Sequence, residues 1–255
     1  VYVRDTNIPI ISISGENPIT IPKDISFNDP GLITLSDISY NVVFNNVDIS
    51  KNGYYGIVYT ACHNNGFINT TMRKVQNYNS NPTILSLNIE TPYYIYKNST
   101  FNINNALTTG INLNVAFNNV DVSNVGNYGV VYTATDINNE NLNTMFLEVR
   151  VRNAITTLNG DNPYYLENGT VYNDPGAITQ DISGNIYTTN VDISDISNNT
   201  IGDYIVSYSS DSFQQSGNIS DNIYRIIFVR DNSHALFNLE CLSSETNVNI
   251  LLTDG

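Results

Sequence analysis

The chain is built from short stretches in which apolar and polar residues alternate, and one such stretch occurs three times. It reads GYYGIVYTA at 53–61, GNYGVVYTA at 126–134 and GDYIVSYSS at 202–210. In the second copy Tyr128, Val130 and Tyr132 share one face, as the two-residue period of a pleated strand requires. Other short apolar runs recur about every ten residues between Asn-Gly, Asp-Pro-Gly or Asn-Asn turns, and helical periodicity of useful length is not visible. The pattern therefore predicts antiparallel β-strands along the whole chain.

The repeated strand has a specific structural interpretation. In immunoglobulin-like sandwiches a Tyr near the start of the penultimate strand buries its ring and turns its hydroxyl back to the backbone of the preceding corner. We expect this role for Tyr55, Tyr128 and Tyr204, and we expect the preceding glycines, Gly53, Gly126 and Gly202, to form the corner. The predicted inward-facing core residues are Tyr55, Ile57, Tyr59, Tyr128, Val130, Tyr132, Tyr204, Val206 and Tyr208.

The same unit recurs at landmarks outside this strand. ENPITIPKDISFNDPG at 16–31 corresponds to DNPYYLENGTVYNDPG at 161–176, whereas ETPYYIYKNSTFNINN at 90–105 keeps the first half and lacks Asp-Pro-Gly. Asp-Pro-Gly is a turn sequence in its own right, because Pro presets one φ angle and Gly accepts a positive one. The predicted turn residues are Pro30, Gly31, Pro175 and Gly176.

A unit of about 75 residues is too long for the common solenoids, whose units run roughly 20–50 residues, and suits a small autonomous domain. We therefore predict repeat 1 at 6–77, repeat 2 at 78–152 and repeat 3 at 153–231. The opening VYVRD at 1–5 matches the closing phrase of a unit and predicts the last strand of a preceding repeat. Residues 232–255 are expected to be the start of a fourth repeat or a divergent tail. The predicted fold is all-β: a tandem array of small immunoglobulin-like antiparallel β-sandwiches, strung like beads, each burying its own core.

The order of these motifs resembles a known family. Asn-Pro, Asn-Asp-Pro-Gly, Val-Asp, Gly-x-Tyr-x-Val-x-Tyr-Thr-Ala-Thr-Asp and a closing Val-Arg-Val-Arg or Phe-Val-Arg-Asp are similar to bacterial immunoglobulin-like and hyalin-repeat modules. The resemblance covers nearly the whole chain in three copies. It implies a surface or secreted protein, since such modules occur in tandem in these proteins and in large virion proteins of giant DNA viruses. The antibody variant with paired Cys and a core Trp is excluded, because the chain has no Trp.

Composition and charge limit the classes of molecule that the chain is expected to bind. Hydrophobic residues make up 41% of the chain, which is enough for packed cores, and charged residues only 13%. The formal net charge of −14 disfavours nucleic acid and anionic membrane surfaces as partners. No run approaches the roughly 18 apolar residues of a membrane span. Cationic partners, divalent ions and neutral glycans remain open.

Candidate chemistry is sparse. The two histidines, His63 and His234, have no third group to orient them as a catalytic base, and no zinc, Walker or dinucleotide motif is present. Cys62 and Cys241 occupy non-equivalent places in the repeat, so we expect unpaired, buried, inert thiols. Calcium remains open at the Asp-Pro-Gly turns and around Asp231, although turn geometry is the favoured role of Asp-Pro-Gly. We predict no catalytic residues, no metal ligands and no cofactor.

The sequence as a whole favours a non-enzymatic structural repeat protein of a virion or cell surface, acting as a fibre, spacer or coat component. One alternative is an adhesive module that binds glycans or proteins, and Tyr93, Tyr94, Tyr164 and Tyr165 are candidates for a sugar-binding face or for packing against the next repeat. A second alternative is an accessory region of a larger secreted enzyme. Neighbouring structural proteins or surface glycans are the expected partners. Lateral homo-assembly is also open, because edge strands can pair and Lys, a common guard against edge pairing, is scarce.

Overall fold

The computed structural model describes residues 8–34, 38–62, 66–77, 85–104, 106–108, 111–135, 142–210 and 220–231. All regular structure in these residues is β-strand, which confirms the all-β prediction. Within them no helix is long and apolar enough to cross a membrane. The predicted segments 1–5 and 232–255 lie outside the described residues, and the boundaries of the repeats stay a prediction.

Repeat 1 is a sandwich of two sheets. β1 pairs with β3, and the larger sheet has the order β4-β5-β6-β2, with β2 parallel to β6. Its strands are β1 (Ile11–Ile13), β2 (Ile19–Ile21), β3 (Leu32–Thr34), β4 (Ser39–Asn45), β5 (Gly53–Cys62) and β6 (Ile68–Asn77). Its buried core consists of Ile21, Tyr55, Ile57, Tyr59 and Val75.

Repeat 2 has the same plan. β7 pairs with β9, and the larger sheet has the order β10-β11-β12-β8. Its strands are β7 (Leu85–Leu87), β8 (Tyr93–Tyr96), β9 (Ala106–Thr108), β10 (Ile111–Asn118), β11 (Gly126–Thr135) and β12 (Leu142–Arg152). Its buried core consists of Leu85, Ile95, Tyr128, Val130, Tyr132, Ala134, Leu147, Val149 and Val151.

Repeat 3 carries one more short strand. Its sheets have the orders β13-β15-β16 and β14-β19-β18-β17. Its strands are β13 (Ala154–Leu158), β14 (Tyr164–Glu167), β15 (Ala177–Asp181), β16 (Ile186–Tyr187), β17 (Asn190–Asp192), β18 (Gly202–Ser209) and β19 (Ile223–Arg230). Its buried core consists of Leu166, Tyr172, Val206, Tyr208, Ile227 and Val229.

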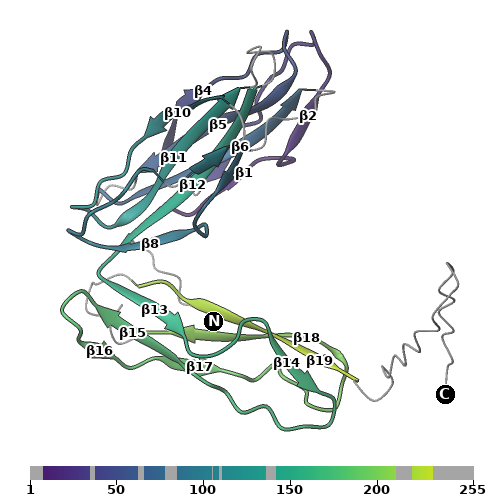
Figure 1. Cartoon of the computed structure of the whole chain (residues 1–255), viewed down its shortest axis with the longest axis vertical. Coiled ribbons are helices and arrows are strands. Elements are labelled where there is room, and N and C mark those ends of the chain that lie inside the picture. Colours follow the sequence, from purple (N-terminus) through teal and green to yellow (C-terminus); the bar gives the residue numbers. More distant parts are fainter. Residues whose placement is uncertain are drawn as a thin grey trace, which may run out of the picture.

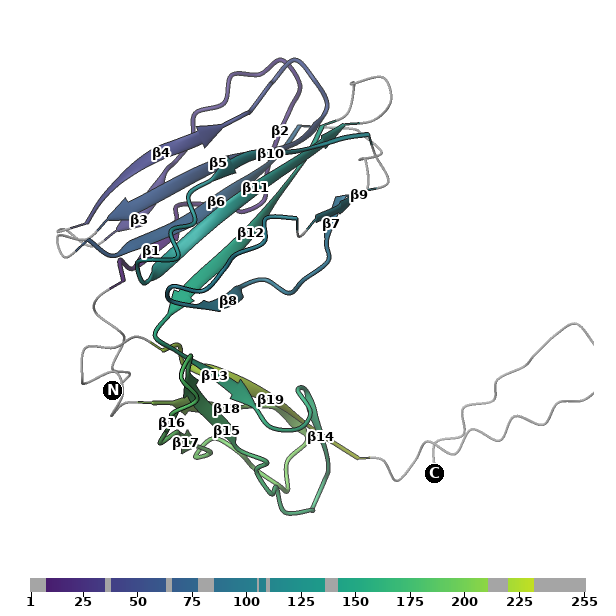
Figure 2. The ribbon, with the colours of Figure 1, turned by 60° about the vertical axis from the view of Figure 1, so that its left-hand side comes forward.

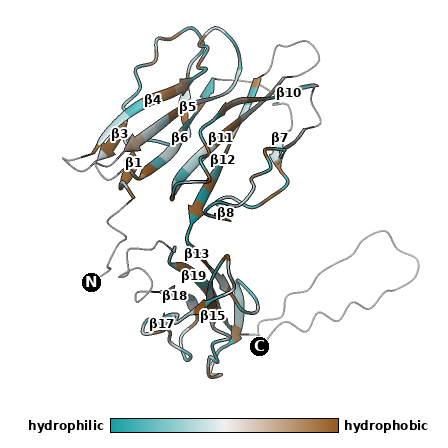
Figure 3. Cartoon of the chain, turned by 90° about the vertical axis from the view of Figure 1, so that its left-hand side faces the viewer, coloured by the Kyte–Doolittle hydropathy of each residue, from teal (hydrophilic) through white to brown (hydrophobic). Residues whose placement is uncertain are grey.

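The three copies of the central strand, β5, β11 and β18, start with the same contact. The hydroxyls of Tyr55, Tyr128 and Tyr204 donate to the backbone oxygens of Lys51, Asn124 and Thr200, each at 2.9 Å. Each acceptor lies four residues before its Tyr, in the loop that leads into the strand. These bonds fix the corner before each central strand. Hydrophobic segments lie along strands of all three repeats (Figure 3).

The repeats are not arranged as a simple string of beads. β1 to β12 form one body and β13 to β19 a second body below it (Figures 1 and 2). Each repeat has its own core cluster, as expected, but repeats 1 and 2 lie side by side with backbone bridges between their sheets. The expectation of end-to-end beads is therefore wrong for this pair, because the outer faces of their larger sheets pack on each other.

Candidate functional site

The first candidate site is the face-to-face contact between repeats 1 and 2, called the pairing surface below. Val58 and Val131 alternate with the inward-facing core residues, so in an isolated sandwich they would face solvent. Both are fully buried. A Cβ added to Gly56 would lie 2.5 Å from Met72 Sδ of the same repeat and 3.1 Å from Thr144 Cγ2 of repeat 2, so the missing side chain leaves room both for Met72 and for the second sheet.

Hydrogen bonds cross the pairing surface in both directions. Asn46 Nδ2 donates to Thr144 Oγ1 at 3.0 Å, and Asn119 Nδ2 donates to Thr70 Oγ1 at 3.0 Å. The amide oxygens of Asn46 and Asn119 each accept a backbone N–H of their own repeat at 2.8 Å. Each asparagine is thus anchored to its own repeat through its amide oxygen and bonds the other repeat through its amide nitrogen.

The pairing surface has approximate two-fold symmetry. Phe44 of β4 meets Phe117, the corresponding residue of β10, with ring centroids 6.3 Å apart. A Cβ on Gly129 would lie 3.1 Å from Thr70 Cγ2, which mirrors the contact of Gly56 with Thr144. Equivalent groups therefore contact each other reciprocally, as in an isologous dimer, but within one chain.

The corner glycines serve this surface as well. Leu142 bridges Gly53 and Ile68 bridges Gly126 across the two repeats. A Cβ on Gly53 would lie 2.8 Å from the Leu142 oxygen, and one on Gly126 3.1 Å from the Ile68 oxygen. For Gly202 of repeat 3 the three nearest atoms all belong to Tyr204, at 3.4 Å or more. The glycine is thus required by a neighbouring repeat in the first two copies.

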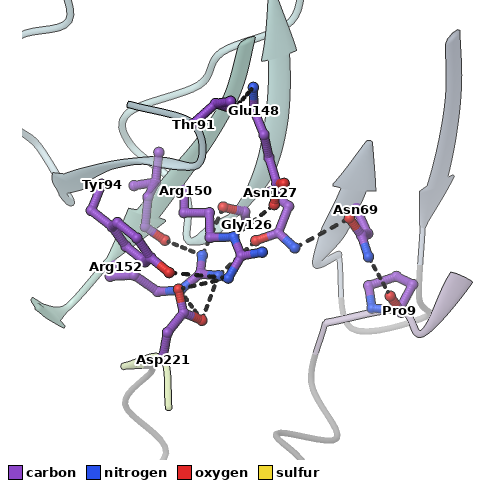
Figure 4. Close-up of polar contacts among 11 residues, drawn as sticks. Pro9, Asn69, Thr91, Tyr94, Gly126, Asn127, Glu148, Arg150, Arg152 and Asp221 are labelled. Carbon is purple, nitrogen blue, oxygen red and sulfur yellow. Dashed lines mark hydrogen bonds and ion pairs between the residues drawn. The ribbon is translucent and has the colours of Figure 1, made fainter. Parts of the chain in front are cut away.

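The second candidate site is the junction between repeats 2 and 3 (Figure 4). Arg152, at the end of β12, has only 1% of its side chain exposed, and its Nε and Nη2 donate to Asp221 Oδ1 at 3.0 and 2.8 Å. Its other bonds go to the oxygens of Gly126 and Val151 and to Asn127 Oδ1, at 2.9, 3.0 and 2.6 Å. A buried cation of repeat 2 is therefore neutralised by a carboxylate of repeat 3.

The junction extends to repeat 1 through a chain of side-chain amides. Asn127 Nδ2 donates to Asn69 Oδ1 at 3.2 Å, and Asn69 Nδ2 donates to the Pro9 oxygen at 2.8 Å (Figure 4). Together with Arg152 and Asp221 these contacts connect all three repeats. The junction therefore lies where the pairing surface ends and repeat 3 begins.

A second arginine reinforces the junction electrostatically. Arg150 donates to Glu148 Oε1 at 2.6 Å, to the Tyr94 hydroxyl at 3.2 Å and to Asp221 Oδ2 at 3.4 Å. Burial raises the pKa of Tyr94 to about 12, and the negative charge of Asp221 adds to the effect. Tyr94 is thus neutral at physiological pH and packs beside the next repeat, which was one of its two expected roles.

The Asp-Pro-Gly turns of repeats 1 and 3 cover a buried arginine. Arg73 is fully buried; its Nε donates to Asp29 Oδ1 at 2.8 Å and its Nη2 to the Gly31 oxygen at 3.1 Å. The Tyr59 hydroxyl donates to the other Asp29 oxygen at 2.5 Å, and its pKa is raised by burial and by this bond. Gly31 has φ of +74°, which explains the glycine after Pro30.

Repeat 3 contains the equivalent cluster. Fully buried Arg225 donates from Nε to the Tyr208 hydroxyl at 3.0 Å and from Nη2 to the Gly176 oxygen at 3.1 Å. Tyr208 donates to Asp174 Oδ1 at 2.5 Å, and Gly176 follows Pro175 with φ of +80°. These carboxylates neutralise a buried guanidinium, so calcium ligation, which the sequence left open beside the favoured turn role, is not needed to account for them.

Repeat 2 lacks both the arginine and the aspartate of this cluster. Leu147 pairs with Val130 just as Arg73 pairs with Ile57 and Arg225 with Val206, so the three positions are equivalent. Leu147 is fully buried, and the Tyr132 hydroxyl donates to the Ile103 oxygen at 2.6 Å instead of to an aspartate. The loss of Asp-Pro-Gly in this copy thus accompanies the loss of the arginine that it serves.

The predicted site residues lie in structural positions. The core residues of the first two copies, together with Val206 and Tyr208, are buried, whereas Tyr204 is only half-buried. Cys62 is exposed, which corrects the expectation of a buried thiol, because it ends β5 beyond the buried part of the sheet. His63, His234 and Cys241 lie outside the described residues. In the described part of the chain no group of three or more His, Cys, Asp or Glu side chains is placed to hold a metal ion.

Sequence reasoning missed the residues that join the repeats. The phrase FNNVD at 44–48 and 117–121 is identical in the first two copies and absent from the third, and its second Asn forms the cross-repeat bond. The sequence does carry a signal for the buried arginines: Arg73 and Arg225 occur in the two copies that have Asp-Pro-Gly, and the copy without it has Leu147 at that position. Asp221 carries no such signal, since its equivalents in the other repeats are not acidic.

Comparisons with known proteins identify a family for two parts of the chain. A family model described as bacterial surface protein, Ig-like domain, matches residues 11–76 and 156–229. Comparison with curated protein sequences found no match. Among solved structures, Drosophila N-cadherin EC1-3 is similar at 10% identity and a TM-score of 0.30, covering 86% of this chain and 99% of that one.

Two further solved structures are similar at the same low level. The protocadherin gamma B4 extracellular domain matches with 11% identity and a TM-score of 0.24 over 90% of this chain and 50% of that chain. The M60 catalytic domain with two CBM51 domains of Clostridium perfringens ZmpB matches with 14% identity and a TM-score of 0.26, over 88% of this chain and 31% of that chain. The chain thus spans half the length of the first of these relatives.

Proposed function

The chain belongs to the family of bacterial surface protein Ig-like domains, and we propose that it is a non-enzymatic structural part of an extracellular surface. In this proposal it acts as a fibre, spacer or coat component of a cell or of a virion. Its neighbours would be other structural proteins of that surface or surface glycans.

The observation that carries the proposal is the use of the repeated motifs for packing. The corner tyrosines bond to the backbone, the Asp-Pro-Gly carboxylates bond to buried arginines, and the corner glycines admit the neighbouring repeat. All three kinds of group therefore serve packing and inter-repeat geometry. A chain that places its polar residues in this way is suited to a mechanical task.

The mechanism follows from the two inter-repeat contacts. Pairing of repeats 1 and 2 gives a body two sandwiches wide, and Arg152 with Asp221 sets the direction in which repeat 3 leaves it. A linker of one residue, Asn153, separates β12 from β13, so little backbone is free to bend. The proposed module is therefore a stiff spacer with a defined bend.

An adhesive module is the second candidate, favoured by one specific observation. Tyr165 of repeat 3 is 70% exposed, whereas the equivalent Tyr94 of repeat 2 packs at the junction. An exposed aromatic surface in one copy alone is expected of a binding face. An accessory role in a larger secreted enzyme is the third candidate, and the domain content of the parent protein would decide it.

The experiment that tests the proposal is immunogold electron microscopy of the source cell or particle, with antibody raised against the folded chain. We expect regular label at the outer surface that disappears when the surface layer is stripped. Label confined to the interior would refute a surface function. Label found only in the secreted fraction would refute the coat or fibre role and favour the accessory role.

A further inference from the structure

The larger sheet of repeat 3, β14-β19-β18-β17, has an outer face with an apolar centre. The strand register places Ile205 beside Ile226, Phe228 beside Tyr165, and Tyr224 in the neighbouring row of the same face. Ile205, Ile226, Tyr165 and Tyr224 are 56%, 42%, 70% and 50% exposed. Tyr165 and Phe228 already stack, with ring centroids 5.3 Å apart. A contiguous exposed patch of large apolar side chains marks an interaction surface.

This face corresponds to the pairing surface of the first two repeats. Ile205 pairs with Ile226 as Gly56 pairs with Lys74 and Gly129 with Glu148. In repeats 1 and 2 the equivalent faces cover each other, whereas in repeat 3 no described residue of the chain covers Ile205 and Ile226 to this extent. Among the described residues, the same fold thus buries this face twice and leaves it exposed once.

Substitutions within the face make that exposure more costly. Ile226 of repeat 3 occupies the position of Lys74 in repeat 1 and Glu148 in repeat 2. Ile205 occupies the position that is glycine in both of the other repeats. Polar residues at these positions would keep an unpaired sheet soluble, whereas isoleucine favours burial by about 25 cal/mol per Å² of apolar surface removed from water. The composition of the face therefore fits a surface that is covered in the working protein.

We propose that this face binds the same face of repeat 3 in a second copy of the chain, by two-fold, sheet-on-sheet packing. Repeats 1 and 2 show within one chain that two copies of this sandwich pair through this face with approximate two-fold symmetry. An isologous contact needs only one self-complementary patch, which is the simplest way for related surfaces to associate. Because Ile205 fills the space that Gly56 leaves open, the proposed dimer has sheets at the ordinary spacing of about 10 Å.

The repeat 1–2 contact also sets the orientation of the proposed pair. In that contact the start of β5 meets the start of β12, so opposite ends of the two faces lie together. In a pair of repeats 3 the same geometry places the end of the face with Arg230, which pairs with Asp203 of its own copy, beside the opposite end of the second copy. The contact then has an apolar centre and a polar rim, which is typical of a specific protein interface.

The inference deepens the proposed function, since it names the lateral partner of the surface module. The test is sedimentation velocity of the intact 28.3 kDa chain over a range of concentrations. We expect a reversible monomer–dimer equilibrium. We compare Ile226→Lys, which installs the residue of the equivalent repeat 1 position, with Val171→Lys, a control at an 80% exposed residue outside this sheet.

Ile226→Lys should weaken dimerisation at least tenfold, because each dimer contains the substitution twice and buries two like charges, and Val171→Lys should leave it unchanged. Unchanged thermal unfolding of the Ile226→Lys chain verifies that repeat 3 is folded. A chain that stays monomeric at every concentration, or two variants that weaken the dimer equally, would overturn the inference. A monomeric chain that still labels the outer surface leaves the surface function standing. A dimeric chain found only in the interior would refute the surface function and support the pairing.

Discussion

Removing the carboxylate of Asp221 should loosen the junction between repeats 2 and 3 without unfolding either repeat. In the Asp221→Ala chain, Arg152 loses both bonds to Asp221, which is its only carboxylate partner in the described part of the chain, while it keeps Gly126, Val151 and Asn127 as acceptors. Because the repeats have separate cores, the chain can relieve the unpaired charge by opening the junction to water.

The magnitude follows from the burial of the two partners. Removing one partner of a buried ion pair costs about 3–5 kcal/mol, because the other charge stays desolvated. The side chains of Arg152 and Asp221 are 1% and 16% exposed, and Arg152 retains other acceptors, so we expect about 3 kcal/mol, the low end of that range. The matched control is Asp203→Ala, since Asp203 pairs with Arg230 in an exposed contact, at 62% and 41% exposure, and such pairs contribute about 0–1 kcal/mol.

Amide hydrogen exchange followed by mass spectrometry measures this cost locally. A loss of about 3 kcal/mol should accelerate exchange roughly hundredfold in peptides that cover the end of β12 and the start of β19. Peptides of β5 and β6 should exchange as in the parent chain. Unchanged exchange at the junction, or equal acceleration in Asp203→Ala, would show that Arg152 and Asp221 do not hold the repeats together.

Three further predictions concern the pairing surface, the buried clusters and the dependence on pH. Gly129→Ile should lower the free energy of unfolding by about 2 kcal/mol in urea titrations, because the new side chain collides with Phe146 of its own repeat and crowds Thr70 of repeat 1, whereas repeat 3 natively has isoleucine at this position. Arg225→Leu should cost about 3 kcal/mol by circular dichroism, since the carbonyls and the Tyr208 hydroxyl that it bonds lose their donor and Asp174 loses its ion pair, and adding Asp174→Ile, the residue that repeat 2 has at this position, should recover part of this loss. Burial raises the pKa of Tyr55 and Tyr128 from 10.0 to about 12. Because the pKa of each tyrosine is higher in the folded chain than in the unfolded chain, the stability that the neutral tyrosines contribute to the fold is complete below about pH 10 and is lost as the pH rises through about 12. Phenolate absorbance that rises together with unfolding in an alkaline titration verifies this last prediction, and ionisation of all tyrosines near pH 10 with the fold intact would contradict it.

The elements that the sequence predicts well are those set by local pattern. Alternation along β5, β11 and β18 identifies the inward face, since side chains on a strand point to opposite sides at every step. The tyrosine at the third position of each central strand bonds the backbone four residues earlier, so its contact is also encoded locally. Because the motif occurs in three copies, each of these inferences rests on three independent stretches of sequence.

The arrangement of the repeats could not be predicted in the same way. Gly56 and Gly129 look like interruptions of a strand, but each leaves room for a side chain of its own repeat, Met72 or Phe146, and for a threonine of the opposite sheet. Whether an outward face meets solvent or another repeat depends on contacts between residues far apart in sequence, such as Asn46 with Thr144. Strand periodicity is the same in both cases, which is why the sequence predicted independent beads.

The central claim is that repeats 1 and 2 work as one laterally paired body, and disulfide trapping tests it most directly. In a chain with serine at positions 62 and 241, we would introduce Gly56→Cys with Thr144→Cys, whose proximity follows from the 3.1 Å between a Cβ at Gly56 and Thr144 Cγ2. The control pair is Ile205→Cys with Thr144→Cys, because Ile205 is the equivalent position in repeat 3. We predict rapid formation of an intramolecular disulfide in the first pair alone, detected by mass spectrometry of proteolytic fragments. Failure of the first pair to cross-link, or equal rates in both pairs, would contradict lateral pairing and restore the string of independent beads.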